Sequence, residues 1–255
     1  MEQQPINKKE IVISLKNLSK SFGEQHVLTD INLEVYKGEN VALLGKSGSG
    51  KSVLIKLIVG LLKPTQGEIK VMDKNVNQIS SIELNKLRLK IGFSFQSSAL
   101  YDSMNIYENL AFPLKMNVKN LSSSDVKQAV EEALTEVGLI DKIKQMPSDL
   151  SGGQRKRIGI ARTLIMKPEI MLYDEPTSGL DPITSAEINN LIIDVQKKYK
   201  TSAIIITHDL TCARNTSNRC AVLLEGKILK AGTFEEVFQS ENEQIKSFYN
   251  YNFIQ

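Results

Sequence analysis

A glycine-rich segment between two apolar runs constrains this chain most strongly. Residues 45–52 read GKSGSGKS, after the apolar run Val41–Leu44 and before residues with helical apolar spacing. A G-x-x-x-x-G-K-[ST] loop between a strand and a helix suits phosphate, because glycines let backbone N–H groups and the helix N-terminus face the anion. The alternative is a plain flexible turn. The pattern predicts a nucleotide site in which Lys51 reaches the β- and γ-phosphates and Ser52 ligates Mg²⁺. Its other members are Gly45, Ser47, Gly48, Ser49 and Gly50.

The rest of the chain alternates strand and helix patterns. The first forty residues read as strands and turns, and a helix is expected over 52–62, ended by Pro64. From about 106 to 163 the pattern is helical, and its clearest helix has Ser124 as candidate N-cap and Gly138 as candidate end. Further strands are expected at 67–72, 90–95, 169–175 and 202–207. A helix is expected at 184–199 and a hairpin at 220–233. This order predicts a mainly parallel α/β core with an inserted helical subdomain.

Two carboxylates follow the apolar residues 170–173. Asp174 and Glu175 would lie at the carboxyl end of a strand, where parallel sheets bind ligands. Asp174 could therefore hold Mg²⁺, and Glu175 could orient and deprotonate water. His208 follows another apolar strand pattern and could contact the γ-phosphate. The alternatives are a solvated strand end before Pro176 and a histidine that is exposed or caps a helix.

Composition and charge exclude several classes of protein. The 255 residues are 41% hydrophobic and carry a net charge of +3, as in a globular domain. This mild charge does not favour nucleic acid, and the basic run Arg155–Arg157 is more typical of a solvated face or of salt bridges. No apolar run has the length to cross a bilayer, and the polar first ten residues do not predict a signal peptide. Cys212 and Cys220 are expected to be reduced thiols.

The segment LSGGQ, Leu150–Gln154, provides a second candidate anion site. Its serine and glycines precede a basic helix pattern, so a second helix N-terminus is available to phosphate. One phosphate loop with two such helix starts suggests that two copies of the chain share nucleotide. The chain resembles the ATP-binding subunits of ABC transporters over nearly its whole length. The motifs follow that family's order: the phosphate loop, Gln96 in FSFQ, LSGGQ, YDEP at 173–176, SGLD at Ser178–Asp181, and His208.

This resemblance implies roles for individual residues. Phe22 matches the aromatic position that stacks on adenine, and Gln96 matches the glutamine that contacts Mg²⁺ and the attacking water. It implies a head-to-tail dimer with twofold symmetry that holds two ATP molecules between the copies. The residues that would act across this dimer are Ser151, Gly152, Gly153, Gln154 and Asp181. ATP binding would close the dimer and hydrolysis would open it.

The implied fold is that of a P-loop NTPase of the ABC ATPase type. It is an α/β fold with a mainly parallel core sheet, an antiparallel β subdomain and an inserted α-helical subdomain. We expect one ABC ATPase domain over residues 1–255. Within it, we expect the core and β subdomain at about 1–96 and 164–240, the helical subdomain at about 97–163, and a C-terminal extension at 241–255.

The segment after Gln96 indicates a narrower resemblance. Residues 95–114, FQSSALYDSMNIYENLAFPL, are similar to the Mla-type lipid transport ATPases, although Gln154 stands where that group often has methionine. The resemblance implies an inner-membrane permease, an MCE-domain lipid-binding protein and phospholipid transport between inner and outer membranes. The chain would be peripheral on the cytoplasmic face of the inner membrane. Four side chains would contact a permease helix or pack in the helical subdomain: Tyr101, Met104, Tyr107 and Phe112.

Other ABC systems share every catalytic residue of this chain. Amino-acid import, lipoprotein release and cell division therefore stay open as alternatives. A non-transport ATPase acting on DNA or ribosomes fits less well, because those usually have two ATPase units in one chain or a long coiled-coil insertion. The aromatic residues near the C-terminus are many for a free tail, so we expect them to pack on a partner subunit or a small accessory protein. They are Phe248, Tyr249, Tyr251 and Phe253.

Overall fold

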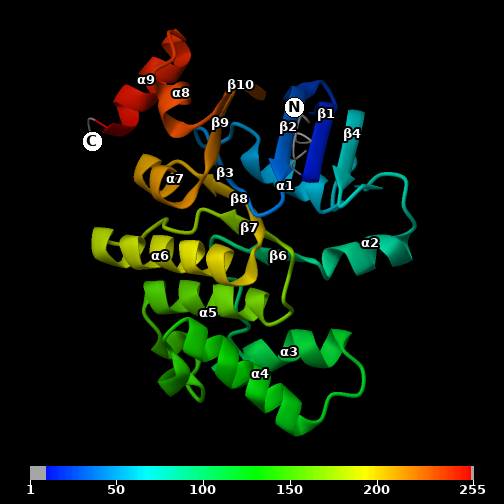
Figure 1. The fold of residues 1–255 in the computed structure, drawn as a ribbon, viewed down its shortest axis with the longest axis vertical. Coiled ribbons are helices and arrows are strands. Elements are labelled where there is room, and N and C mark those ends of the chain that lie inside the picture. The colour runs from blue at the N-terminus through cyan, green and yellow to red at the C-terminus, as the bar shows by residue number, and fades with distance from the viewer. Residues whose placement is uncertain (1–9, 254–255) are drawn as a thin grey trace, which may run out of the picture.

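The computed structural model describes residues 10–253 and contains two β-sheets with helices packed around them (Figure 1). The larger sheet has six strands in the order β10-β9-β3-β8-β7-β6, and its neighbours are parallel except for the β9–β10 hairpin. Its strands are β3 (Asn40–Leu44), β6 (Ile91–Ser94), β7 (Ile170–Asp174), β8 (Ser202–Thr207), β9 (Arg219–Leu224) and β10 (Lys227–Gly232). Every residue of β3 and β8 is buried, as expected for parallel strands covered on both faces. The predicted mainly parallel core is confirmed.

A smaller antiparallel sheet of four strands lies at the top of Figure 1, in the order β2-β1-β4-β5. Its strands are β1 (Ile11–Phe22), β2 (Gln25–Tyr36), β4 (Gln66–Val71) and β5 (Lys74–Asn75). Ile13, Leu15 and Leu18 on β1 are buried in the same hydrophobic cluster as β3 and α1. The smaller sheet therefore packs directly beside the strand and the helix that flank the phosphate loop.

Several helices cover the larger sheet. They are α1 (Lys51–Ile58), α2 (Ser81–Arg88), α6 (Pro182–Tyr199), α7 (Leu210–Thr216), α8 (Phe234–Phe238) and α9 (Glu243–Phe253). The expectation that the first helix runs to residue 62 and ends at Pro64 was wrong. It ends at Ile58, and Gly60 adopts a left-handed φ of +68° two residues later. A glycine in this conformation commonly terminates a helix, so it acts before the proline is reached.

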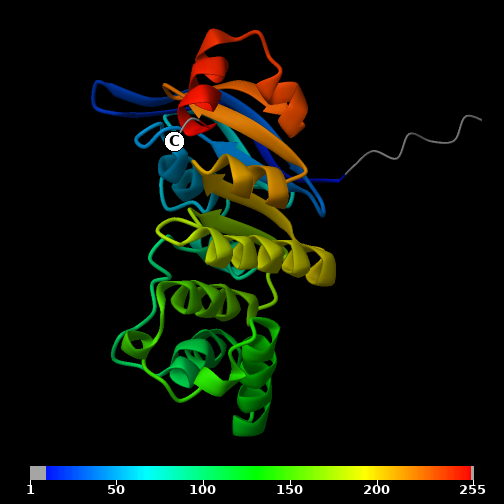
Figure 2. The same cartoon turned by 90° about the vertical axis from the view of Figure 1, so that its left-hand side faces the viewer.

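A layer of helices lies below the sheets in Figures 1 and 2. It consists of α3 (Ile106–Asn117), α4 (Ser123–Glu136), the short 3₁₀ turns η1 (Ile140–Lys142) and η2 (Pro147–Asp149), and α5 (Gly152–Leu164). Ser122, and not the expected Ser124, caps α4: its hydroxyl accepts from the Asp125 N–H, and the Asp125 carboxylate accepts from the Ser122 N–H, in a capping box. Gly138 follows the end of α4 with φ +68°, as expected.

Helix α5 connects this layer to the core. Ile158 and Ala161 are buried against α3 and α4, whereas Ile160 and Leu164 are buried with residues of β7 and α6. Helix α5, which begins in the LSGGQ segment, is therefore packed on two sides. A displacement of α5 would have to move contacts on both of them.

The C-terminal helix α9 packs on its own chain. Phe248 is 1% exposed and lies in one hydrophobic cluster with Ile245 and Val237. The ring of Tyr249 lies 5.1 Å from that of Phe238. The expectation that these aromatics pack on another subunit was therefore wrong for Phe248, which fills the chain's own core. Tyr251 is 63% exposed, and the side chain of Phe253 lies outside the described residues.

Both cysteines are free and buried, as expected for reduced thiols. Burial raises the pKa of the Cys212 thiol to about 12 and that of the Cys220 thiol to about 12. Between residues 10 and 253, no helix combines the length and the hydropathy that crossing a membrane requires.

Candidate active site

The phosphate loop, Gly45–Ser52, connects the buried strand β3 to α1. A Cβ atom at Gly45 would stand 2.2 Å from the carbonyl oxygen of Leu223, so this position admits only glycine. Gly50 takes a left-handed φ of +102° at the start of α1, which glycine adopts at little cost. Within the described residues, no side chain caps α1, so its first N–H groups are available to an anion.

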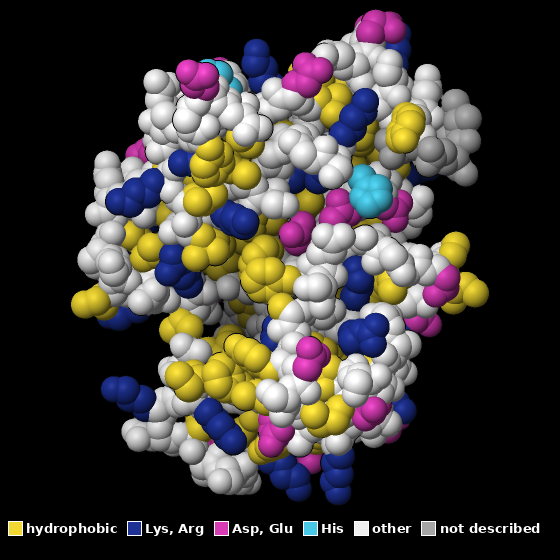
Figure 3. All heavy atoms as spheres, turned by 180° about the vertical axis from the view of Figure 1, so that it is seen from behind, with side chains coloured by type: hydrophobic (Ala, Val, Ile, Leu, Met, Phe, Trp, Pro, Cys, Tyr) yellow, Lys and Arg dark blue, Asp and Glu magenta, His cyan; other side chains and the backbone are white. Residues whose placement is uncertain are grey.

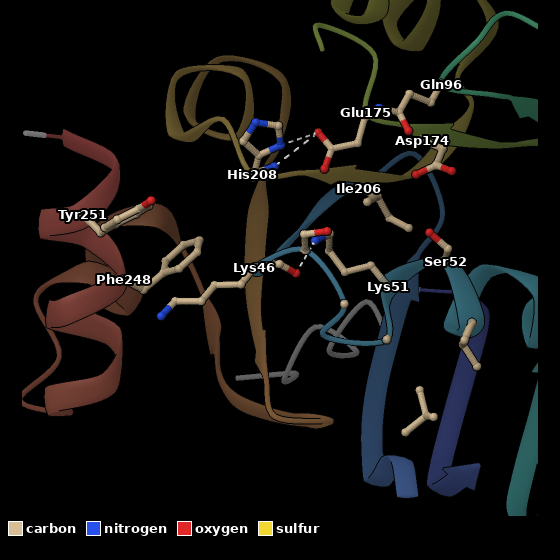
Figure 4. A pocket seen from close by; sticks show the side chains of 15 residues that line it. Lys46, Lys51, Ser52, Gln96, Asp174, Glu175, Ile206, His208, Phe248 and Tyr251 are labelled. Carbon is tan, nitrogen blue, oxygen red and sulfur yellow. Dashed lines mark hydrogen bonds and ion pairs between the residues drawn. The ribbon is translucent and has the colours of Figure 1, made fainter. Parts of the chain in front are cut away.

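The hydroxyls of this loop fit a phosphate ligand and its cation. Ser49 Oγ is buried, and no group in the described part of the chain hydrogen-bonds to it. A buried hydroxyl without a partner is costly, and a bound phosphate oxygen would satisfy it. Ser52 lines the pocket at the first turn of α1 (Figure 4). With the nearby Asp174 carboxylate, it offers the oxygen ligands that Mg²⁺ prefers.

Lys51 is held inside the loop that it follows. Its Nζ donates to the carbonyl oxygens of Gly45 at 2.6 Å and Lys46 at 2.9 Å. Burial lowers the pKa of Lys51, while Glu175 and Asp174 act in the opposite direction. The ammonium is therefore preorganised in a largely desolvated loop, where a phosphate would compete for its donors.

The two carboxylates and the histidine come together at the carboxyl ends of β7 and β8. Glu175 Oε2 lies 2.8 Å from His208 Nδ1, and the Glu175 N–H donates to the carbonyl of Ile206 at 2.9 Å. Glu175 itself has a left-handed φ of +49°, which is uncommon for a non-glycine residue. Burial, followed by the neighbouring Glu175, raises the pKa of Asp174. Figure 4 shows Asp174 and Glu175 projecting into the same space above the phosphate loop.

Lys156 extends from α5 to the backbone of Glu175, a contact that the sequence did not predict. Its Nζ donates to the carbonyl oxygen of Glu175 at 2.9 Å, and burial lowers the pKa of Lys156. The neighbouring Arg157 pairs with Glu187 on α6. Arg157 therefore forms a salt bridge within its own chain, as one interpretation of the basic run predicted, whereas Lys156 donates to a backbone carbonyl.

These groups surround one pocket with a volume of about 790 Å³. Most predicted residues of the site line it: Ser47, Gly48, Gly50, Lys51, Ser52, Gln96, Asp174, Glu175 and His208. Ser49 lines a second hollow of about 440 Å³, which shares Lys46, Ser47 and Gly48 with the main pocket. Two unpredicted residues of α9, Phe248 and Tyr251, also line the main pocket. Their position depends on how α9 folds back, for which the sequence gives no local signal.

Phe22 and Gln96 lie at the margins of this site. Phe22 ends β1 and is 46% exposed, with Lys20 Nζ 4.7 Å from its ring centroid, and it is not among the pocket residues. Gln96 follows β6, and its Nε2 donates to Ser178 Oγ at 3.3 Å. Gln96 therefore bridges the end of β6 and the turn that follows Glu175.

The LSGGQ segment lies outside the pocket. Ser151 caps α5, since its hydroxyl accepts from the Gln154 N–H while Gln154 Oε1 accepts from the Ser151 N–H. A Cβ atom at Gly153 would stand 2.3 Å from Thr184 Cγ2, so close packing on α6 requires this glycine. At Gly152 the nearest atom would be 3.6 Å away, so packing within this chain does not explain that glycine.

Asp181 caps α6 and is also outside the pocket. Its carboxylate accepts from the N–H groups of Ile183 and Thr184 and from the Thr184 hydroxyl. These bonds, first the one from the Thr184 hydroxyl, hold the pKa of Asp181 below its usual value. The structure thus separates the predicted residues into two groups, one around the phosphate loop and one at the starts of α5 and α6.

Sequence comparison identifies relatives over most of the chain. A family model described as "ABC transporter" matches residues 28–178. The "Probable ribonucleotide transport ATP-binding protein mkl" of Mycobacterium leprae is 38% identical over 240 residues, which is 94% of this chain and 69% of the relative. The "Methionine import ATP-binding protein MetN 1" of Bacillus thuringiensis is 41% identical over 231 residues, which is 89% of this chain and 68% of the relative.

Solved structures share the fold. The ATP-binding cassette MJ0796, solved as a post-hydrolysis dimer bound to ADP and Pi, superposes with a TM-score of 0.79 at 34% identity, covering 87% of this chain and 98% of that one. CbiO1 of Clostridium perfringens, part of the ABC transporter complex cbiONQ, gives a TM-score of 0.84 at 32% identity, covering 96% and 97%.

Proposed function

The chain belongs to the ABC transporter family, as an ATP-hydrolysing subunit, and on this premise we propose that it energises phospholipid transport between the inner and outer membranes. The residues of the pocket would hydrolyse ATP. The surface that would face a permease indicates which substrate is transported.

The residues that line the pocket would have different roles in ATP hydrolysis. Lys51 and the N–H groups at the start of α1 would bind the phosphates, while Ser52 and Asp174 would hold Mg²⁺ with Gln96 near it. Glu175 would take the proton of the attacking water, because it projects into the pocket from the end of β7. His208 would orient that carboxylate through the 2.8 Å contact. When bound, Mg²⁺ would neutralise charge that develops on the phosphates.

A second copy of the chain would complete each site. The start of α5 offers N–H groups and a small residue, Gly152, whose identity no contact within the chain requires. The start of α5 does not line the pocket of its own chain. A nucleotide phosphate that contacts it would therefore be bound in the pocket of another copy. This supports a twofold dimer with two shared ATP molecules, in which Ser151, Gly153 and Asp181 also face the partner.

The permease would dock beside the Gln96 segment. Leu89, Phe95 and Tyr101 are 40%, 44% and 46% exposed. A hollow of about 180 Å³ lies between β6 and α5, lined by Phe93, Met166 and neighbouring residues. On the face opposite to the view in Figure 1, hydrophobic side chains gather around a hollow above the helical layer (Figure 3). An apolar helix end of a membrane protein fits such a surface.

Of the four side chains proposed for permease contact, Tyr101 is the best placed. Its ring meets Phe112 at 5.2 Å and stays exposed. Tyr107 instead packs against the buried residues of the helical layer. The permease contact would therefore centre on the stretch between Phe95 and Tyr101, with the chain peripheral at the cytoplasmic face of the inner membrane.

The single observation that carries the lipid assignment is the Mla-like sequence of residues 95–114, which supplies this exposed surface. It supports an inner-membrane permease and an MCE-domain lipid-binding protein as partners. A second candidate is amino-acid import, favoured by the 41% identity to a methionine import ATPase. Both candidates use the same pocket and differ in the permease.

Affinity purification of the chain from its native membrane, followed by mass spectrometry, separates them. Recovery of a multi-pass permease together with an MCE-domain protein would support phospholipid transport. Recovery of a permease with an amino-acid-binding protein would keep the ATPase mechanism and replace the substrate. A matched preparation of Tyr101→Ala, whose folding is checked by its Tm, should lose the permease if the proposed surface is used.

A further inference from the structure

The segment that carries Gln96 has an unusual backbone. It joins β6 to α3, and within it Ser98 and Ala99 adopt left-handed φ values of +62° and +47°. Two consecutive non-glycine residues in this region are unfavourable by themselves. They persist only where surrounding contacts determine the conformation, so neighbouring groups must hold this segment.

Arg162, near the end of α5, holds the strained carbonyls directly. Its guanidinium donates to the carbonyl oxygen of Ala99 at 2.7 Å and to that of Ser98 at 3.2 Å. Its Cζ also lies 5.6 Å from the ring centroid of Tyr101. A planar fork of donors suits two adjacent carbonyls in a way that a single ammonium does not.

Gly159 brings α5 against the same backbone. It lies three residues before Arg162, so both occupy one face of the helix. A Cβ atom at Gly159 would stand 3.1 Å from Ser98 Cβ and 3.3 Å from Ser98 Cα. The helix therefore approaches the segment so closely that only a small residue fits between them.

The far end of the segment is held by α3. Asn109 is completely buried, its Oδ1 accepts from the Tyr101 N–H at 2.8 Å, and its Nδ2 lies 3.0 Å from the Tyr101 carbonyl oxygen and 2.9 Å from that of Met104. Both anchors thus belong to the helical layer. Toward the core, the side chain of Gln96 has the 3.3 Å contact to Ser178.

The same helix α5 begins with Ser151, at the LSGGQ segment. Ser151 and Arg162 are separated by about 16 Å along a continuous helix, at about 1.5 Å per residue. We propose that Arg162 is a positioning residue that ties Gln96 of one nucleotide site to α5, whose start would contact the nucleotide of the other site. A shift of α5 on nucleotide contact would then move the Gln96 segment with it, through the Arg162 fork. This inference rests on the proposed role of Gln96 in hydrolysis.

A double-mutant cycle on the full-length chain tests the link. Arg162→Ala should lower kcat for ATP by roughly 10- to 100-fold, as expected for a misplaced catalytic contact, and change KM by less than about twofold. Arg162→Lys should recover part of the loss. In a Gln96→Ala background, Arg162→Ala should have little further effect on kcat, because the residue that it positions is already absent.

The outcomes distinguish failure of the inference from failure of the proposed function. If Gln96→Ala hydrolyses ATP as fast as the wild type, the role of Gln96 is wrong. If Gln96→Ala is impaired and the two effects simply multiply, Arg162 does not act through Gln96. If Arg162→Ala has a lower Tm but an unchanged kcat, Arg162 contributes to stability and does not position Gln96. Arg157→Ala is the matched control. It removes the same charge from α5, but the side chain that is lost contacts Glu187 and not the Gln96 segment.

A spectroscopic measurement keeps the test open if hydrolysis becomes too slow to compare. The chain contains no tryptophan, so Phe95→Trp places a single reporter beside Gln96. Adding Arg162→Ala should increase quenching of this reporter by acrylamide, whereas adding Arg157→Ala should not. Equal quenching in all three proteins would show that Arg162 does not order the segment.

Discussion

Replacing Lys51 by alanine should weaken ATP binding without disrupting the fold. Its ammonium donates to the carbonyl oxygens of Gly45 and Lys46. Burial lowers the pKa of Lys51, so the charge is already held in surroundings that disfavour it, and an anion would relieve this. The side chain therefore contributes mainly when phosphate is bound.

The magnitude follows from the contact that is lost. A hydrogen bond to a charged group contributes about 1.5–3 kcal/mol, which is roughly a 10- to 100-fold increase in Kd. At an ATP concentration about 100 times the wild-type Kd, binding stabilises the folded chain by about 2.7 kcal/mol. The same concentration should stabilise Lys51→Ala by only about 0.4–1.4 kcal/mol. The ATP-induced rise in Tm should then fall from roughly 5–11 °C to roughly 1–6 °C.

Thermal unfolding with and without Mg²⁺ and ATP measures this directly. Lys63→Ala is a suitable control, because Lys63 is exposed beyond the end of α1. It should show the full wild-type shift. An equally large shift for Lys51→Ala would refute the assignment of Lys51 to the phosphates.

Three further predictions test other parts of the site. Glu175→Gln should lower the rate of hydrolysis by roughly 10²–10⁴-fold while the ATP-induced rise in Tm stays, since only the base is lost; unchanged turnover would contradict it. Gly153→Ala should destabilise the chain by about 1–3 kcal/mol in urea unfolding, because its Cβ would meet Thr184 Cγ2. The control Gly152→Ala should leave stability unchanged. The pKa of Asp181 is lowered in the folded chain, so its stabilising effect is present above the usual value of 3.8 and is lost as the pH falls through the folded pKa. The stability gap between wild type and Asp181→Ala should therefore stay constant from pH 7 to about pH 4 and narrow below that, and an undiminished gap at about pH 3 would argue against an ionised cap.

The sequence predicted the parts of the site that depend on neighbouring residues. The phosphate loop, Asp174, Glu175 and His208 each follow a buried strand, and parallel pairing brings the ends of these strands to one edge. Given the positions of the strands, their order in the sheet is enough to bring the two carboxylates close to Lys51.

The sequence could not predict contacts that depend on tertiary packing. Lys156 reaches the carbonyl of Glu175 because α5 lies beside β7, and no spacing in the chain encodes that distance. Phe248 was expected to contact another subunit, whereas α9 packs it into a hydrophobic cluster of its own chain. The choice of Ser122 over Ser124 as cap depended on the reciprocal bond with Asp125, which a serine-rich stretch leaves ambiguous.

The burial of both cysteines has a practical consequence for following the dimer. Reactive thiols need an accessible thiolate, and neither Cys212 nor Cys220 offers one at neutral pH. A cysteine introduced on the surface, for example at the exposed Ser148 before the LSGGQ segment, would therefore be labelled selectively in the otherwise natural sequence. Energy transfer between dyes on two such copies would then report their approach and separation during a single cycle of ATP use.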